Sequence, residues 1–371
     1  MSKPRLKSSY SRITTDGELS LFREAGSWIT LPDPDGQLET LIDLLDGSRS
    51  SQAVAAAMKS RWPDLTEAEV AEGIASLDEI GLLEDATAAS ALTPWQEERF
   101  ASNLAFFSTF AGLGRSRFEF QERLRRAHVV LLGVGGVGST LLLNLAGLGV
   151  GRVTALDCDA VEAKNLTRQF LYTEAEIGAP KLARAIARAQ ALNHELRIAG
   201  VERRVTGPED IAPLLPGADL VLSAIDRPDE VQSWVNRECV AAGVPFITGG
   251  IQVARGGYYS VDPGRSGCVA CWHAAAARAG NASPGSGGGE QVNRAIGPAA
   301  SLVGGLIALE AVRYLTGFAP PVSAAKVWLV DLVTGEIGIG HEWSRLPDCP
   351  VCGVERTGET PAAEFLAGVA R

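Results

Sequence analysis

Residues 128–139 read HVVLLGVGGVGS, an apolar run that ends in closely spaced glycines. Gly133, Gly135 and Gly138 have the spacing G-x-G-x-x-G, and a fourth glycine lies at Gly136. Between a strand and a helix, such glycines let backbone N–H groups approach a phosphate, and the helix adds its positive N-terminal end. The stretch therefore predicts a nucleotide-binding turn, but alone it does not separate hydride transfer from other nucleotide chemistry.

The chain beyond this turn alternates between strand and helix patterns. Strand patterns cover 128–134, 152–159, 218–226 and 244–251, and helix patterns cover 138–150, 231–243 and 297–317. Such alternation is typical of a mostly parallel sheet with helices on both faces. A hairpin is expected within 325–343, around Thr334 and Gly335. The predicted fold class is therefore α/β, with a Rossmann-like sheet.

The first 92 residues have a different pattern. Three strand-like runs at 10–15, 18–23 and 27–32 precede three helix-like segments at 36–45, 50–62 and 66–83. Ser50 or Ser51 is the expected N-cap of the second helix, and Thr66 with Glu69 forms a capping-box pattern. This order predicts a small winged-helix-like α+β domain, for which a generic helical lid is the alternative.

The predicted boundaries follow from these patterns. They are a first domain at 1–92, a connecting helical segment at 93–126, a main domain at 127–357 and a tail at 358–371. The Gly/Ser-rich run at 279–290 predicts a mobile loop.

Composition narrows the possible functions. The net charge is −10, from 34 basic and 44 acidic residues, which argues against an extended nucleic-acid surface. The N-terminus lacks the apolar core of a secretory signal, and we find no uninterrupted apolar run of about 18 residues. We therefore expect a cytoplasmic protein that binds neither nucleic acid nor membrane.

Polar residues after the second and later strands favour a nucleoside triphosphate. Asp157 ends the second strand, 24 residues past Gly133, where an acidic side chain accepts hydrogen bonds from a ribose hydroxyl. Asp226 ends a later strand and suits a Mg²⁺ ion that bridges phosphate oxygens. The residues expected around the phosphates are Asp159, Asn165, Arg168, Gln169 and Lys181. Their charges match phosphoryl or adenylyl transfer better than binding of a dinucleotide.

Four of the six cysteines form two C-x-x-C pairs, Cys268 with Cys271 and Cys349 with Cys352. Four thiolates from two such turns match a closed tetrahedral Zn²⁺ site. Such a site is structural because it leaves no position open for a substrate. Redox chemistry is the alternative, but two pairs in one chain have a simpler joint explanation.

Through these motifs, the chain resembles the ThiF/MoeB superfamily of ubiquitin-activating-like adenylating enzymes. The resemblance covers residues 94–355 and rests on GVGGVGS, LDCDAVEAKNLTRQFLY, IGAPK, SAID and the cysteine pairs. It implies a homodimer that binds Mg-ATP, adenylates a carboxylate and releases pyrophosphate. It also implies that Asp157 holds the ribose, that Asn165, Arg168, Gln169 and Lys181 hold the phosphates, and that Asp226 holds Mg²⁺.

The chain departs from this family pattern in three places. Arg227 follows the strand-end aspartate where the family has asparagine. The family's R-[YF]-x-R-Q segment, which sends an arginine into the neighbouring subunit's ATP site, appears here as RFASN. Ser102 stands at the place of the second arginine, and Arg99 remains as the candidate for that role in ATP binding. The run GEQVNRAIGPAAS lacks the cysteine that thioester-forming members carry, and neither Cys158 nor Cys239 is expected to act as a nucleophile.

The first domain resembles the PqqD-like peptide-recognition module, on its L-x-G-[ST]-R turn (45–49) and closing L-x-x-x-G-L-L (77–83). Such modules hold a leader peptide as an added strand. The acidic third helix disfavours the alternative of a DNA-binding winged helix. This layout resembles enzymes that activate precursor peptides, as in microcin C biosynthesis. We therefore expect adenylation of a ribosomal peptide; a sulfur-carrier adenylyltransferase or a non-catalytic leader-binding scaffold are the alternatives.

Overall fold

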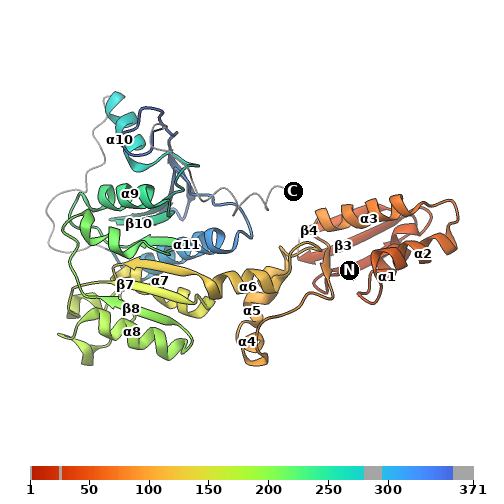
Figure 1. Cartoon of the computed structure of the whole chain (residues 1–371), viewed down its shortest axis with the longest axis horizontal. Helices are drawn as coiled ribbons and strands as arrows, with labels where there is room; N and C mark the ends of the chain where they lie inside the picture. The colour runs from red at the N-terminus through yellow and green to blue at the C-terminus, as the bar shows by residue number, and fades with distance from the viewer. Residues whose placement is uncertain (1, 25–26, 280–294, 354–371) are drawn as a thin grey trace. The chain divides into compact units, whose positions relative to one another are not determined.

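The computed structural model describes residues 2–24, 27–279 and 295–353 (Figure 1). It contains two compact units, 1–122 and 123–371, which we describe separately. The division falls inside the predicted connecting segment 93–126, so two of its helices belong to the first unit. The predicted tail 358–371 and nearly all of the predicted loop 279–290 lie outside the described residues, and the functional boundary at residue 92 stays a prediction.

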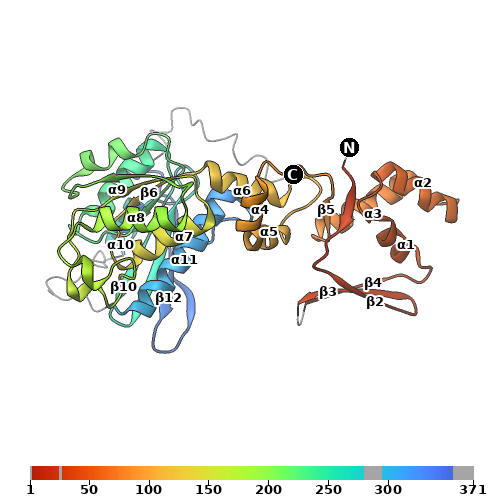
Figure 2. The same ribbon diagram turned by 90° about the horizontal axis from the view of Figure 1, so that it is seen from below.

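The first unit is an α+β unit with two small antiparallel sheets. The three-stranded sheet has the order β2-β3-β4, and β1 pairs with β5 in a second sheet. Its elements are β1 (Pro4–Leu6), β2 (Ser11–Thr15), β3 (Glu18–Glu24), β4 (Ser27–Pro32), α1 (Gln37–Leu44), α2 (Ser51–Arg61), α3 (Glu67–Glu79), β5 (Leu83–Asp85), α4 (Pro94–Arg99) and α5 (Ala101–Ser108). Figure 2 shows β2, β3 and β4 side by side.

Local sequence explains where these helices begin. Ser50 caps α2 by accepting a hydrogen bond from the Ala53 N–H (3.3 Å), and Thr66 and Glu69 form a reciprocal capping box at α3. Buried apolar side chains of the sheet and the three helices form one core, which includes Leu21 and Ile74. The predicted strands and helices of this region are confirmed. The three-residue strands β1 and β5 escaped prediction because they are too short to show an alternating pattern.

The second unit contains an eight-stranded, mostly parallel sheet in the order β13-β12-β11-β10-β9-β6-β7-β8. Strands β8, β7, β6, β9 and β10 are parallel to their neighbours, whereas β11, β12 and β13 continue antiparallel. The strands are β6 (His128–Leu132), β7 (Arg152–Leu156), β8 (Arg197–Val201), β9 (Leu220–Ser223), β10 (Phe246–Gln252), β11 (Arg255–Val261), β12 (Lys326–Asp331) and β13 (Ile337–Glu342). The predicted α/β class is confirmed.

Helices α7 (Gly136–Leu148), α8 (Lys181–Leu192) and α9 (Val231–Ala242) follow the parallel strands β6, β7 and β9. Helix α6 (Arg117–Arg126) precedes β6 and crosses the boundary between the units, and α10 (Val269–Arg278) and α11 (Gly297–Thr316) follow β11. The chain runs outward from β6 through β7 to β8 and then returns to the other side of β6 at β9. This reversal opens a crevice at the carboxyl ends of β6 and β9, the usual ligand position in such sheets.

Helix α11 is a long apolar helix that packs within the second unit. On length and composition alone this helix could cross a membrane. However, 61 % of its most apolar window is buried, and the helix packs against α7 and β10. Its apolar character is explained by this burial, because Ala299, Val303 and Ile307 are nearly inaccessible.

Candidate nucleotide site and metal centre

A cavity of about 1060 Å³ lies at the carboxyl ends of β6, β7 and β9. It is lined by nearly all of the residues that the sequence singled out for nucleotide binding: Gly133, Gly135, Gly136, Asp157, Asp159, Asn165, Arg168, Gln169, Lys181 and Asp226. Two predicted residues are not among the lining: Gly138, which packs beneath the turn, and Arg99, which belongs to the first unit. The structure thus gathers one site from strands that are distant in sequence.

The glycines of the turn have different physical roles. Gly133 has φ +88°, and a Cβ there would approach Ile225 Cγ2 to 2.7 Å. A Cβ on Gly138 would lie 2.0 Å from the Gly133 carbonyl oxygen, so only glycine lets α7 begin so close to β6. Gly135 and Gly136 have no contact this tight and face the cavity. Their bare backbone is therefore available to a phosphate.

Asp157 is anchored by the turn that it faces. One carboxylate oxygen accepts the Val134 N–H and the other accepts the Asp159 N–H, both at 2.8 Å. Tyr172 donates its hydroxyl to the Val134 carbonyl at 2.8 Å, and burial, followed by the charge of Asp157, raises the pKa of this phenol. Each Asp157 oxygen keeps further acceptor capacity, which suits the two hydroxyls of a ribose.

The cavity carries a positive charge balance in an acidic protein. Seven basic residues line it: Lys164, Arg168, Lys181, Arg203, Arg204, Arg227 and Arg255. Five acidic residues line it: Asp157, Asp159, Glu162, Asp226 and Asp229. The difference is 7 − 5 = +2, against −10 for the whole chain. An anionic ligand is therefore favoured at this position.

The cationic side chains are held in place at the edge of the cavity. Lys181 opens α8, is 4 % exposed, and lies 3.1 Å from the Asp159 carboxylate through its Nζ atom. Arg168 donates to the Lys164 carbonyl at 3.1 Å. Lys181 is buried but pairs with an exposed carboxylate, so its Nζ atom can also contact a phosphate without moving far.

Two glutamines present buried acceptors to this cavity. Among the described residues, neither Gln169 Oε1 nor Gln232 Oε1 has a hydrogen-bond partner. Gln232 is oriented by its Nε2, which donates to Ser223 Oγ (3.2 Å) and to the Ile225 carbonyl (2.7 Å). Buried acceptors without donors are costly, so both atoms indicate a ligand that supplies N–H or O–H groups. These observations fit a nucleotide.

Asp226 ends the segment after β9 and is exposed to the cavity. Within the described parts of the chain its carboxylate makes no hydrogen bond or ion pair, whereas the neighbouring Arg227 pairs with Asp229 at 2.8 Å. A carboxylate kept free of protein cations at this edge fits a Mg²⁺ ligand.

Sequence reasoning missed several residues that line the cavity: Arg203, Arg204, Gln232, Gln252 and Arg255. Arg204 lies 3.8 Å from Asp159, which brings the end of β8 to the ribose side of the cavity. No motif marks these residues, because they come from α9 and from the ends of β8, β10 and β11, which only the folded chain brings to one cavity.

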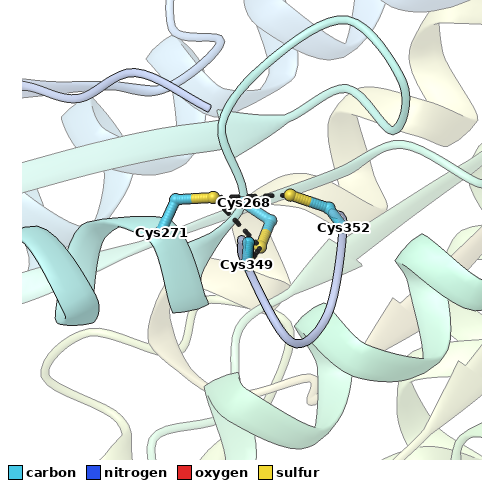
Figure 3. Close-up of side chains that lie close together, drawn as sticks. All are labelled: Cys268, Cys271, Cys349 and Cys352. Carbon is cyan, nitrogen blue, oxygen red and sulfur yellow. Dashed lines mark hydrogen bonds between the residues drawn. The ribbon is translucent and has the colours of Figure 1, made fainter. Parts of the chain in front are cut away.

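The four paired cysteines form a second cluster in the same unit. Their sulfur atoms all lie within 4.8 Å of one another and are buried, at the start of α10 and in the turn that contains Cys349 and Cys352 (Figure 3). Three of the Sγ–Sγ separations are 3.4, 3.6 and 3.9 Å. A tetrahedral zinc with Zn–S bonds of about 2.3 Å requires sulfurs about 3.8 Å apart. The cluster therefore fits zinc, as predicted.

Neighbouring groups hold the backbone of this metal centre. Trp343 donates its indole N–H to the Cys268 carbonyl at 3.0 Å, and Arg345 Nε donates to the Cys352 carbonyl at 3.0 Å. Cys271 directly precedes Trp272, which lines the nucleotide cavity. The metal centre therefore fixes one wall of that cavity as well as the C-terminal turn.

The sequence profile of the ThiF family matches residues 102–351. The chain belongs to the ThiF family. Sulfur carrier protein ThiS adenylyltransferase of Escherichia coli K12 is 33% identical over 244 residues, which cover 63% of this chain and 88% of the relative. Sulfur carrier protein adenylyltransferase of Thermus thermophilus is 35% identical over 244 residues, covering 64% and 87%. By the family match and these identities, the chain is a ThiF-family adenylyltransferase.

A structural match extends over both units. Crystal structures of E. coli MccB superpose with a TM-score of 0.75 at 20% identity, covering 97% of this chain and 99% of that one. Structures of MccB with ATP and with N-formylated MccA match at a TM-score of 0.73. At this identity the match establishes a shared fold, which includes the small α+β unit.

The two remaining cysteines of this ThiF-family chain do not have the environment of a nucleophile. Cys239 is fully buried on α9, and burial raises its pKa far above the ordinary range. Cys158 lines the cavity, but burial, together with the charges of Asp159 and Asp157, raises its pKa despite Arg204. Both thiols therefore stay protonated near neutral pH.

We expect Cys158→Ala and Cys239→Ala to retain pyrophosphate exchange within about twofold of the unaltered chain, because neither thiol is assigned to a thioester. The assay is steady-state exchange, with thermal unfolding to report any packing loss at the buried position. If Cys158→Ala lowered pyrophosphate exchange more than 100-fold at unchanged stability, Cys158 would have to be assigned a covalent role.

The arginine predicted to reach a neighbouring subunit has its own setting in this ThiF-family chain. The Arg99 guanidinium lies over the rings of Trp95 (5.6 Å) and Phe100 (5.7 Å), within the first unit. A transfer of Arg99 to another subunit's site stays a prediction, as does the consequence of Ser102.

Proposed function

We propose that this chain adenylates a carboxyl or carboxamide group of a ribosomally made precursor peptide with ATP. The observation that carries the proposal is the net-positive cavity that combines a bare glycine turn, the anchored Asp157 and the buried Gln169 acceptor. These features match the phosphates, the ribose and further donor groups of one nucleotide. Charge neutralisation and positioning are what such a transfer needs.

In the proposed reaction, a carboxylate oxygen attacks the α-phosphorus of ATP. The new bond forms an acyl adenylate, and the bond from the α-phosphorus to the bridging oxygen breaks to release pyrophosphate. Asp157 holds the ribose, while Lys181 and Arg168 offset negative charge on the phosphates. Asp226 would hold Mg²⁺, which supplies further charge neutralisation when bound.

The first unit supports a peptide as substrate. Its three-stranded sheet has β2 and β4 as edge strands, and a cavity of about 340 Å³ lies nearby, lined by apolar side chains including Leu38, Leu41 and Met58. Peptides bind such modules as an added strand with side chains in adjacent pockets. Structures of MccB, described as a microcin C7 biosynthetic enzyme, were obtained with the peptide MccA.

We also propose that the working form is a homodimer. Helix α11 carries Leu302 and Leu309, which are 42 % and 39 % exposed and lie two turns apart on one side of the helix. Ile296, just before α11, is 62 % exposed. A second copy of the chain would cover these apolar side chains.

The alternative hypothesis, that the chain is a sulfur-carrier adenylyltransferase, is favoured by a different observation: the 33–35% identity to sulfur-carrier adenylyltransferases. It requires exchange that depends on a small protein ending in Gly-Gly. The hypothesis of a non-catalytic scaffold requires that the chain binds a leader peptide but does not bind ATP. Pyrophosphate exchange with short peptides encoded beside the gene, compared with a Gly-Gly carrier, separates all three.

Peptide capture by the first unit is tested with Leu38→Glu. This change places a charge in the apolar cavity and is expected to weaken precursor-peptide binding by about 10-fold or more, while ATP binding stays unchanged. Calorimetry with the full-length chain measures both affinities. Ile80→Glu is the control, because Ile80 is 46 % exposed and lies outside the cavity. Equal peptide affinity in all three proteins would contradict the assignment of this cavity.

A further inference from the structure

One side of the nucleotide cavity is the open face of the β10–β11 hairpin. Residues opposite each other in an antiparallel pair project to the same face. All five pairs from Thr248 with Tyr259 to Gln252 with Arg255 border the cavity. Three of them project to one face: Thr248 with Tyr259, Gly250 with Gly257, and Gln252 with Arg255. The centre of this face therefore carries two glycines directly opposite each other and has no side chain.

The neighbouring glycines Gly249 and Gly256 face the opposite side of the hairpin, where α11 packs. A Cβ on Gly249 would lie 2.9 Å from Ile307 Cδ1, and a Cβ on Gly256 would lie 2.5 Å from Val303 Cγ2. Both contacts are with α11, so these two glycines allow the helix to approach the sheet. The close approach of α11 therefore explains why these two positions are glycine, and no ligand is needed to explain it.

Gly250 has no such explanation. A Cβ there would have no heavy atom within 4 Å, and its backbone is not left-handed. Neither packing nor backbone conformation requires glycine at this position. The missing side chain at Gly250 leaves a hollow in the cavity floor. At the opposite Gly257 an added Cβ would lie 3.0 Å from Leu329 Cδ2 and 3.1 Å from the Trp328 carbonyl oxygen, so Leu329 bounds the hollow on that side.

One side of this hollow is aromatic and apolar, whereas Thr248, Gln252 and Arg255 project to the same face beside it. Tyr259 and Trp272 meet edge to face, with ring centroids 5.7 Å apart at 84°. Trp272 is held by stacking on Trp343, at 5.0 Å and 16°. Val327 and Leu329 of β12 line the same cavity. We call Gly250, Gly257, Tyr259, Trp272, Val327 and Leu329 the glycine-floored pocket.

This pocket lies next to the reacting groups. Strand β10 pairs in parallel with β9, and the last pair is Thr248 with Ser223. Gly250 lies two residues beyond that pair on β10, and Ile225 lies two residues beyond it in the segment after β9, directly before Asp226. The pocket therefore lies in the same cavity as Asp226, the proposed Mg²⁺ ligand.

We propose that the glycine-floored pocket binds the side chain of the activated C-terminal residue and selects an aromatic one. This inference rests on the proposed function, because it takes a peptide carboxylate as the attacking group. An aromatic side chain would fill the hollow left by Gly250, against Leu329, and contact Tyr259 and Trp272. Edge-to-face and offset contacts between rings add to the gain from apolar burial.

The test uses the full-length chain and four probes at millimolar concentration. These are N-acetylated Gly-Gly-Gly-Phe and its variants ending in Leu, Ala and Gly. We measure peptide-dependent pyrophosphate exchange, and binding by calorimetry with a non-hydrolysable ATP analogue present. For the unaltered chain we expect kcat/KM to be at least about 10-fold higher for the Phe probe than for the Gly probe.

Gly250→Val fills the hollow and is expected to abolish this preference. The ratio of kcat/KM for the Phe probe to kcat/KM for the Gly probe should fall about 10-fold, to near one. Gly338→Val is the matched control, because Gly338 is also a strand glycine with nothing within 4 Å of its added Cβ and lies outside the cavity.

The outcomes separate this inference from the proposed function. Equal kcat/KM for the four probes, unaffected by Gly250→Val, would overturn the aromatic pocket and leave adenylation intact. A chain that binds the ATP analogue but neither binds nor activates any probe would overturn both. Equal losses in Gly250→Val and Gly338→Val would assign the effect to the fold and contradict the pocket.

Discussion

Asp226→Ala is expected to lower peptide-dependent pyrophosphate exchange by about 10²–10³-fold, since it removes the carboxylate proposed to hold Mg²⁺ beside the reacting phosphate. The loss should fall mainly on kcat, because charge neutralisation matters most as the pyrophosphate departs. Exchange of labelled pyrophosphate into ATP measures the rate, and mass spectrometry detects an AMP-linked peptide. Arg168→Ala and Lys181→Ala are expected to be comparably harmful.

Asp229→Ala is the matched control for this change. Asp229 is also an exposed carboxylate on the loop after β9, but it pairs with Arg227 at 2.8 Å. We expect it to retain exchange within about threefold. Exchange that survives in Asp226→Ala, at saturating Mg²⁺ and unchanged stability, would rule out the metal role of Asp226.

Cys271→Ser is expected to remove zinc and to destabilise the second unit by several kcal/mol. Structural zinc sites contribute about 10–16 kcal/mol of binding free energy, and loss of one thiolate removes a substantial part of it. For a unit of this size we expect a fall in Tm on the order of 10 °C. Metal analysis should give one zinc per unaltered chain.

Cys158→Ser is the control for this experiment, because Cys158 lies outside the four-cysteine cluster and is only half-buried. It should keep its zinc and its Tm. Unaltered protein that is fully stable after careful purification without bound zinc would contradict the structural role of the cluster.

Local chemistry made much of this molecule predictable. The glycine turn could be recognised because φ +88° at Gly133 and the close approach at Gly138 each demand glycine. Asp157 and Asp226 could be placed at the edge of the sheet because each closely follows a mainly apolar strand. The zinc cluster needed only the C-x-x-C spacing, which is set by the geometry of a metal-binding turn.

Other features depend on contacts that no short motif records. The end of β8 brings Arg204 to Asp159 only because three parallel strands lie in register. Gln232 could not be identified from sequence, since its role depends on how Ser223 and Ile225 orient its amide. The open floor at Gly250 emerges only when β11 is seen to place Gly257 opposite it.

The metal centre joins two points that are far apart along the chain. Cys268 and Cys349 are separated by 81 positions, and the chain between them includes α11 and the β12–β13 hairpin. Closing a ring of this length costs about 4–5 kcal/mol of chain entropy, so an unfolded chain will seldom bring both turns together around one ion. We infer that zinc is acquired late, after the sheet has placed the turns side by side. Scarcity of zinc in the growing cell would then stall maturation at its last step, with the strands already paired and the wall at Trp272 not yet secured.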